Sequence, residues 1–167
     1  MPKPALPDAE QLLIALTAQM RPHVTAQTGL IGIVTGGAWL AERLHQELKL
    51  EVPYGSLDVS FYRDDFQHKG LKHPIAPSEI PFEVEGRDLI LVDDVLYTGR
   101  TIRAAMNELF DYGRPASIRL AALVDRGGRE LPIAAQFAAT TLTLPARQSI
   151  ELKRDAQGRL SLALIQD

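Results

Sequence analysis

The sequence predicts an α/β fold in which helices flank a mainly parallel central sheet. Short apolar runs rich in β-branched residues alternate with segments of helical periodicity along most of the chain. Most of these runs are apolar throughout, which is typical of strands buried on both faces. The 167 residues, 46% of them hydrophobic, are enough for one domain with one core. Because parallel sheets bind ligands at the carboxyl ends of their strands, functional residues are expected directly after the apolar runs.

The first part of the chain predicts two helices and two strands behind a short leader. Residues 1–7 are rich in proline and are expected to be a flexible leader to one domain at 8–167. Asp8 is a suitable N-cap, and leucines then recur at helical spacing. The predicted elements are a helix over 8–24, a buried strand over 30–34, a helix over 38–50 and an alternating strand over 56–62.

The second part begins with a polar segment, 63–78, that carries glycine and proline and no hydrophobic period. A loop of this length in a compact domain is usually functional or disordered, so we expect a mobile loop. Gly113 is a suitable C-terminal cap for the helix before it. The predicted elements are a strand over 88–92, a helix over 100–112, a strand over 118–124 and a hairpin that pairs 149–153 with 160–165.

Composition narrows the function classes. A net charge of −3 argues against a general nucleic-acid binder, although basic side chains outnumber acidic ones in residues 114–167. Cysteine is absent, which excludes disulfides, thiolate metal sites and a catalytic thiol, and is compatible with the expected cytoplasmic location. No apolar stretch is long enough to span a membrane.

The most informative segment runs from the apolar residues 89–92 through Asp93 and Asp94 to a turn with Thr98 and Gly99. A strand here would bring two carboxylates to the edge of the sheet. The turn opens a helix, whose free N–H groups suit a phosphate. Carboxylates suit a polyol or a hydrated magnesium ion. A sugar phosphate would suit both the turn, through its phosphate, and the carboxylates, through its hydroxyls. The alternative interpretation is a plain strand–helix turn in which Thr98 caps the helix.

Residues 92–101 resemble the phosphoribosyl pyrophosphate (PRPP) motif of type I phosphoribosyltransferases. In their particular amino acids they resemble the version of this motif found in the PyrR family. That family comprises pyrimidine operon attenuation regulators with uracil phosphoribosyltransferase activity. Three further segments agree with it in family order, namely 61–65, 113–118 and 123–133. The resemblance implies a Rossmann-like type I phosphoribosyltransferase fold. A small β hood would form largely from 149–167, and the long loop would close over the substrate.

The resemblance also implies roles for individual residues. Asp93, Asp94 and Arg63 are the expected catalytic residues. The diphosphate loop corresponds to Thr35, Gly36 and Gly37, where the family usually has Thr-Arg-Gly. Arg126 and Ile150 are expected at the base, although the residues alone favour Ile150 as part of the core. The 5′-phosphate and the ribose are expected to bind Asp93, Asp94, Val95, Leu96, Tyr97, Thr98, Gly99, Arg100 and Thr101.

The implied reaction converts uracil and PRPP into UMP and diphosphate, with Mg²⁺ held through the substrate rather than by direct protein ligands. The implied regulation responds to UMP, with a pyrimidine-operon leader RNA as possible partner and a homodimer or higher homo-oligomer as assembly. RNA-attenuating relatives often carry histidine at Gly128 and a basic residue at Ala134. Three alternatives stay open: an RNA-binding attenuator, a nucleotide sensor with weak catalysis, and a phosphoribosyltransferase for a different base.

Overall fold

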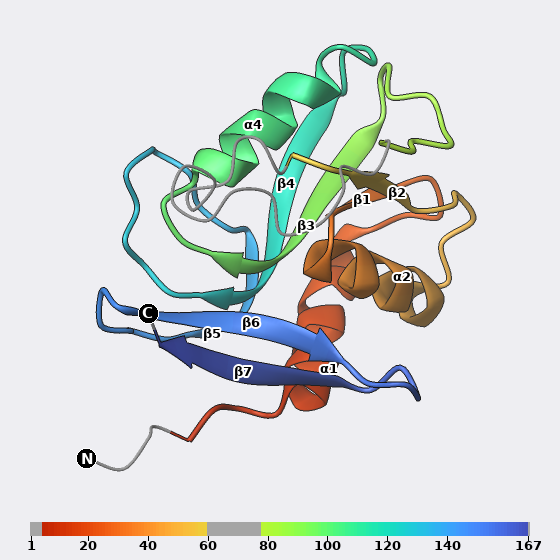
Figure 1. Ribbon diagram of the computed structural model, residues 1–167. Coiled ribbons are helices and arrows are strands. Elements are labelled where there is room, and N and C mark those ends of the chain that lie inside the picture. The colour runs from red at the N-terminus through yellow and green to blue at the C-terminus, as the bar shows by residue number, and fades with distance from the viewer. Residues whose placement is uncertain (1–4, 60–77, 167) are drawn as a thin grey trace.

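A single five-stranded sheet organises the part of the chain that the computed structural model describes, residues 5–59 and 78–166. All its strands are parallel, in the order β2-β1-β3-β4-β5 (Figure 1). The strands are β1 (Gly29–Ile33), β2 (Gly55–Leu57), β3 (Asp88–Leu96), β4 (Ser117–Asp125) and β5 (Phe137–Thr141). The predicted fold class is confirmed, and the parallel arrangement brings the turns after β1, β3 and β4 to one edge of the sheet.

Helices cover both faces of the sheet (Figure 1). The helix α1 (Ala9–Met20) and the helix α2 (Gly36–Leu48) lie on one face, and α4 (Arg100–Leu109) lies on the other. The predicted N-cap is confirmed, because the Asp8 carboxylate accepts a hydrogen bond from the Glu10 amide at 2.8 Å. The α-helix stops at Met20, before the predicted end. A short 3₁₀ turn, η1 (Arg21–His23), follows it and contains Pro22, which has no N–H to continue the helix.

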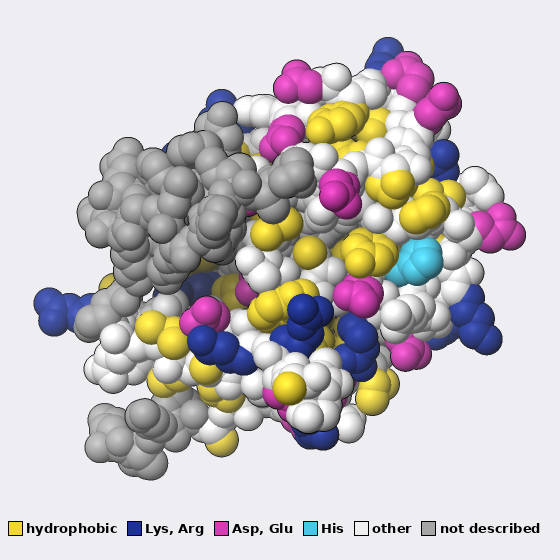
Figure 2. All heavy atoms as spheres, turned by 45° about the vertical axis from the view of Figure 1, so that its right-hand side comes forward, with side chains coloured by type: hydrophobic (Ala, Val, Ile, Leu, Met, Phe, Trp, Pro, Cys, Tyr) yellow, Lys and Arg dark blue, Asp and Glu magenta, His cyan; other side chains and the backbone are white. Residues whose placement is uncertain are grey.

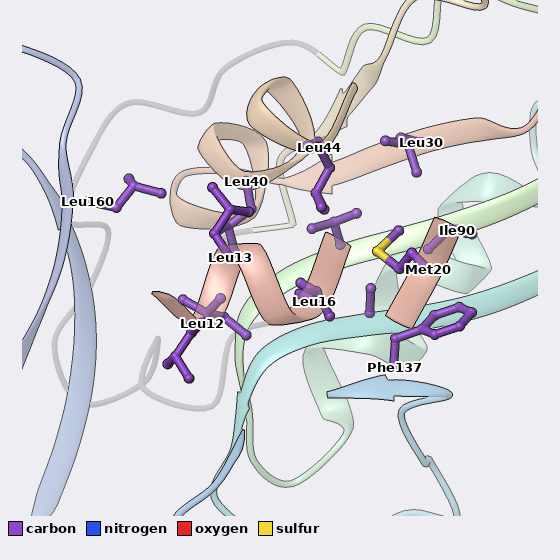
Figure 3. Packing of buried hydrophobic residues seen from close by; sticks show 14 of the residues in the cluster. Leu12, Leu13, Leu16, Met20, Leu30, Leu40, Leu44, Ile90, Phe137 and Leu160 are labelled. Carbon is purple, nitrogen blue, oxygen red and sulfur yellow. The ribbon is translucent and has the colours of Figure 1, made fainter. Parts of the chain in front are cut away.

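Alternation along β3 divides the core into two apolar clusters. Ile90 and Val92 belong to the cluster under α1 and α2, whereas Leu89 and Leu91 belong to the cluster under α4. Figure 3 shows how the leucines of α1 point toward α2 and the sheet. The apolar stripe of α1 recurs at helical spacing and consists of Ala9, Leu12, Leu13, Leu16 and Met20.

The predicted terminal hairpin is confirmed as the antiparallel pair β6 (Gln148–Arg154) and β7 (Leu160–Gln166), which lies across the end toward which β3 and β4 point (Figure 1). Glu10 of α1 anchors it. One Glu10 carboxylate oxygen accepts from the Leu160 amide at 3.0 Å, and Arg43 forms an ion pair with the other at 2.8 Å. The hydrogen bond from Arg43 is the main reason that the pKa of Glu10 is lowered.

Several element boundaries differ from the prediction. The strand predicted over 88–92 continues to Leu96, so both aspartates lie inside β3. The helix predicted to reach residue 112 ends at Leu109, and Gly113 is not its cap. The C-cap is Phe110, whose backbone is in the right-handed helical region. Gly113 lies three residues after Phe110 and packs against Glu85.

Two strands also differ. The strand β5 was not predicted, because its short segment has no clear alternation, and it is defined by pairing with β4. Of the strand predicted over 56–62, Gly55–Leu57 forms β2, and residues 60–62 lie outside the described residues.

Charged side chains are mixed on the face shown in Figure 2, where Lys and Arg gather toward the hairpin end of the molecule. Acidic side chains neutralise much of this basic character. The ion pairs here are Arg43–Glu10, Lys153–Glu151, Arg154–Glu42 and Arg159–Asp8. Within residues 5–59 and 78–166, no helix has the length and the apolar character needed to cross a membrane.

Candidate active site

The acidic pair lies near the end of the central strand β3. Asp93 is only 3% exposed, and its Oδ1 accepts a hydrogen bond from the Asp94 amide at 2.9 Å. Asp94 is half-buried, and its Oδ1 accepts from the Val95 amide at 2.8 Å. Both carboxylates are therefore oriented by the backbone of the strand itself. A rigid element of this kind positions charge better than a loop does.

The turn expected to bind the 5′-phosphate, residues 97–99 and called the phosphate turn below, joins β3 to α4. Gly99 has a φ of 95°, which favours glycine, and directly precedes the first residue of α4. Thr98 is buried, and its Oγ1 accepts from the Arg100 amide at 3.2 Å. The helix α4 begins directly after this turn, and the amides of a first helical turn are the groups that bind anions at helix N-termini.

The other residues expected in the PRPP site differ in exposure. Tyr97 is 37% exposed, Arg100 is exposed and Thr101 is half-buried. The side chains of Val95 and Leu96 pack against the two core clusters instead. Val95 and Leu96 can therefore offer a ligand only their backbone groups.

The predicted diphosphate loop, Thr35 to Gly37, follows β1 and packs directly against the acidic pair. Its two glycines are the first residues of α2, which begins two residues earlier than predicted, and Thr35 is the N-cap residue. The Val34–Thr35 peptide bond is cis. An ideal Cβ built on Gly36 would lie 2.5 Å from Asp94 Oδ2 and 2.9 Å from its Cγ. A Cβ on Gly37 would collide with the Val92 carbonyl oxygen. The two glycines thus bring the backbone of this loop against β3, which places Thr35–Gly37 beside Asp94.

The third turn at this edge follows β4. Arg126, expected at the base, stacks over the Tyr97 ring at 4.0 Å from its centroid, and its buried Nε has no hydrogen-bond partner among the residues that the structure describes. Ile150 of β6 is 7% exposed and belongs to the core cluster under α1 and α2. The structure therefore places Ile150 in the core, as the residues alone favoured, and its contact with a base stays a prediction.

Sequence reasoning missed an ion pair in the loop after β4. Arg129 Nη2 lies 2.6 Å from Asp125 Oδ2. Burial acts to raise the pKa of Asp125, but the hydrogen bonds from Arg129 and from the Gly127 amide outweigh it and lower that pKa. The available signal was the spacing of four residues between the opposite charges of Asp125 and Arg129. That spacing predicts contact only within a helix, and this segment is a loop.

The remaining expected residues cannot be placed. Arg63, the third expected catalytic residue, and most of the long loop over 63–78 lie outside the described residues. Among the described ones, no group of three or more His, Asp or Glu side chains could hold a metal ion. Asp93 and Asp94 supply oxygen ligands of the kind that Mg²⁺ accepts together with water and substrate phosphates, so the donor set fits a substrate-held ion.

The acidic pair, the turn at the N-terminus of α4 and the glycines beside them agree with the class to which the chain belongs, the phosphoribosyltransferases. The phosphoribosyl transferase domain family matches residues 5–143. The fold agrees, because a hypoxanthine phosphoribosyltransferase from Staphylococcus aureus superposes with a TM-score of 0.67 at 20% identity, covering 84% of this chain and 78% of that one. A hypoxanthine-guanine phosphoribosyltransferase from Bacillus anthracis gives a TM-score of 0.67 at 19% identity, covering 89% and 86%.

Curated relatives narrow the family further. The bifunctional protein PyrR of Pseudomonas entomophila is 50% identical over 152 residues, which cover 89% of this chain and 88% of the relative. The bifunctional protein PyrR of Pseudomonas fluorescens is 47% identical over 162 residues, covering 95% and 96%. The chain belongs to the PyrR family of phosphoribosyltransferases. The predicted family and enzyme class are confirmed.

Proposed function

We propose that the protein is a uracil phosphoribosyltransferase that converts uracil and PRPP into UMP and diphosphate, and that it also regulates pyrimidine biosynthetic genes in response to UMP. One observation carries the enzymatic half. The acidic pair, the phosphate turn and the glycine loop meet at one edge of the sheet, beside one another. PRPP has a 5′-phosphate, two ribose hydroxyls and a diphosphate, so each of its parts has a counterpart there. The 50% identity to PyrR proteins supports uracil as the base.

Binding follows from the chemistry of each segment. The amides at the start of α4, with the hydroxyls of Thr98 and Thr101, hold the 5′-phosphate. The backbone of Thr35–Gly37 lies at the N-terminus of α2, and amides at such a helix start face the diphosphate in this proposal. The carboxylate oxygens of Asp93 and Asp94 accept hydrogen bonds from the ribose hydroxyls.

Catalysis then needs positioning and electrostatics rather than a covalent nucleophile. The bond between the anomeric carbon and diphosphate breaks ahead of the new bond to the base nitrogen, which leaves positive charge on the ribose. Asp94, half-buried and fixed by the Val95 amide, places negative charge near that carbon. A magnesium ion bound with the substrate would supply positive charge for the leaving diphosphate. Asp93 and Asp94 would be the residues that hold the ribose hydroxyls beside such an ion.

The hairpin β6–β7 serves as the hood in this proposal, within one domain at 8–167. It lies across the ends of β3 and β4, so a base joined to the ribose would sit between the hairpin and the turn at Arg126 (Figure 1).

The cytoplasm supplies PRPP and uracil, and the protein works there as a homodimer or larger homo-oligomer. Light scattering coupled to size-exclusion chromatography measures that assembly. A monomer at working concentration would overturn this part.

A panel assay tests the enzymatic half. The full chain is incubated with PRPP, Mg²⁺ and uracil, cytosine, hypoxanthine, guanine, xanthine or orotate in turn, and diphosphate release is measured. Release with uracil well above that with the other bases is the expected result. Turnover with another base alone would assign a different specificity. UMP binding without turnover on any base would make the protein a nucleotide sensor.

The regulatory half rests on the bifunctional character in the relatives' name. We expect UMP to occupy the same site and to change the affinity for a pyrimidine-operon leader RNA. RNA binding depends on phosphate neutralisation and weakens with salt. A gel-shift titration of the leader RNA, with and without UMP and at two salt concentrations, measures this. No shift under either condition would confine the protein to catalysis or nucleotide sensing.

A further inference from the structure

The loop between β4 and β5 is fastened to the phosphate turn by its backbone. The Arg126 amide donates to the Leu96 carbonyl at 3.0 Å. The Glu130 and Leu131 amides both donate to the Thr98 carbonyl, at 2.9 and 3.2 Å. Because the carbonyls on this side of the turn are used in this way, the position of the turn depends on the conformation of residues 126–131.

One side chain determines that conformation. Arg129 donates from Nε to the Ile133 carbonyl at 2.9 Å, from Nη1 to the Tyr97 carbonyl at 2.6 Å and from Nη2 to Asp125 Oδ2 at 2.6 Å. It thereby joins the end of β4, the phosphate turn and the far end of its own loop. Its side chain is only 24% exposed. The planar guanidinium can make three such bonds at once, whereas an ammonium group cannot reproduce their geometry.

Gly128, next to Arg129, packs against the ring of Tyr97. Gly128 has a φ of 76°, and an ideal Cβ there would collide with the Tyr97 ring. Arg126 stacks on that ring at 4.0 Å. In this conformation position 128 has no room for a larger side chain such as histidine. The backbone of Gly127 and Gly128 is exposed, whereas the half-buried side chains of Arg126 and Arg129 are engaged with Tyr97 and its carbonyl.

We propose that Arg129 is a positioning residue for phosphoribosyl transfer, which holds the phosphate turn through the Tyr97 carbonyl and sets the turn after β4 in register with it. The proposal rests on the proposed function. Arg129 touches no substrate in it, and its guanidinium is occupied by protein groups instead of being free for a nucleic acid. Loss of Arg129 should loosen the site for every ligand that carries a 5′-phosphate, and free uracil should be affected least.

The experiment compares Arg129→Gln and Arg129→Lys with the matched control Arg114→Gln. Arg114 is exposed and precedes β4, at the opposite end of that strand from the site. For Arg129→Gln, we expect the KM for PRPP and the Kd for UMP to rise together by about tenfold to a hundredfold, as for a site displaced by about 1 Å. The KM for uracil at saturating PRPP should change less than threefold. For Arg129→Lys, both constants should lie between those of wild type and those of Arg129→Gln. Arg114→Gln should have the constants of wild type.

Further readouts separate positioning from other roles. Asp125→Asn and the double variant with Arg129→Gln should have non-additive effects on UMP affinity, because the two side chains act as a unit. An unchanged Kd for UMP in folded Arg129→Gln would overturn the proposal, and so would weaker leader-RNA binding with unchanged UMP affinity. If Arg129→Gln does not fold, Asp125→Asn with wild-type UMP affinity would overturn it equally. Weakened UMP binding in a protein that never turns over uracil would defeat the proposed function and leave the positioning role standing.

Discussion

Two turns at the same edge of the sheet meet their neighbours in different ways. The phosphate turn after β3 is joined to the next loop by hydrogen bonds, since the Thr98 carbonyl accepts two and the Tyr97 carbonyl accepts one from Arg129. The diphosphate loop after β1 has hydrogen bonds to β2 and α2, but close packing sets its contact with β3. Its glycines, Gly36 and Gly37, lie against β3 at distances that exclude a Cβ. A turn of the first kind is loosened when a partner is removed, and a turn of the second kind is disrupted when a single methyl group is added.

Because of this difference, the two turns should respond differently to substitutions. Hydrogen bonds from a loop can lengthen or re-form, so the phosphate turn can adjust as a ligand binds. The packing of Gly37 against the Val92 carbonyl has no such range, because protein interiors are dense and transmit strain. The diphosphate loop should therefore be the less adaptable of the two, and substitutions in it should have the larger effects.

The largest expected effect is that of Gly37→Ala. The new methyl group would collide with the Val92 carbonyl oxygen on the central strand, which cannot move without disturbing the sheet. Turnover should fall by at least about a hundredfold, and urea denaturation should show a loss of about 1–3 kcal/mol in the free energy of unfolding.

Gly86→Ala is the matched control for Gly37→Ala. A Cβ at Gly86 meets nothing within 4 Å, but its φ of 71° disfavours alanine. The control should lose about 1 kcal/mol of stability and keep its activity. Wild-type turnover in Gly37→Ala would contradict the packed description of the loop.

The next effect is expected from Asp94→Asn, which changes the charge between the two turns with little change in shape. If Asp94 stabilises the positive ribose, kcat should fall by about a hundredfold or more while the fold survives. Steady-state kinetics and circular dichroism measure the two outcomes. Asp111→Asn is the control, because Asp111 is exposed and follows α4. Full uracil phosphoribosyltransferase activity in Asp94→Asn would remove the assigned role.

A smaller effect is expected from Gly36→Arg, which introduces the residue usual in the family. Its positive charge alone would strengthen PRPP binding. Its Cβ, however, would lie 2.5 Å from Asp94 Oδ2, so that carboxylate or the loop has to move. We expect the KM for PRPP to rise by about tenfold. Gly36→Ala adds the Cβ without the charge and should raise that KM somewhat more, because no positive charge offsets the displacement. A lower KM in Gly36→Arg would show that the loop adapts and that the packed description is wrong.

The contrast between the turns also shows what the sequence could predict. Most strands, the Asp8 cap and the hairpin follow from local periodicity and turn residues, and they were predicted; β5, which is defined by its pairing with β4, was not. Asp93 and Asp94 were identified because the motif is continuous. The approach of Gly36 to Asp94 was not, because it depends on the register of β1 against β3. Likewise, the hydrogen bond from Arg129 to Tyr97 joins residues 32 positions apart, and nothing local specifies it.

The smallest expected effect tests the hydrogen-bonded turn through pH. The pKa of Asp125 is lowered from its ordinary 3.8, with burial opposing and the hydrogen bonds from Arg129 and Gly127 prevailing. The folded state therefore binds this proton less readily than the unfolded chain. The resulting stability is present above the ordinary pKa and is lost as the pH falls through the lowered one.

Asp125→Asn lacks this titration, which makes it the variant to compare. Urea denaturation of both proteins should give a difference in the free energy of unfolding that is constant near neutral pH. That difference should shrink, by about 1 kcal/mol or less, as the pH is lowered below about 4. A difference independent of pH down to the acid limit of folding would mean that the Asp125–Arg129 pair does not fasten the turn through its charge.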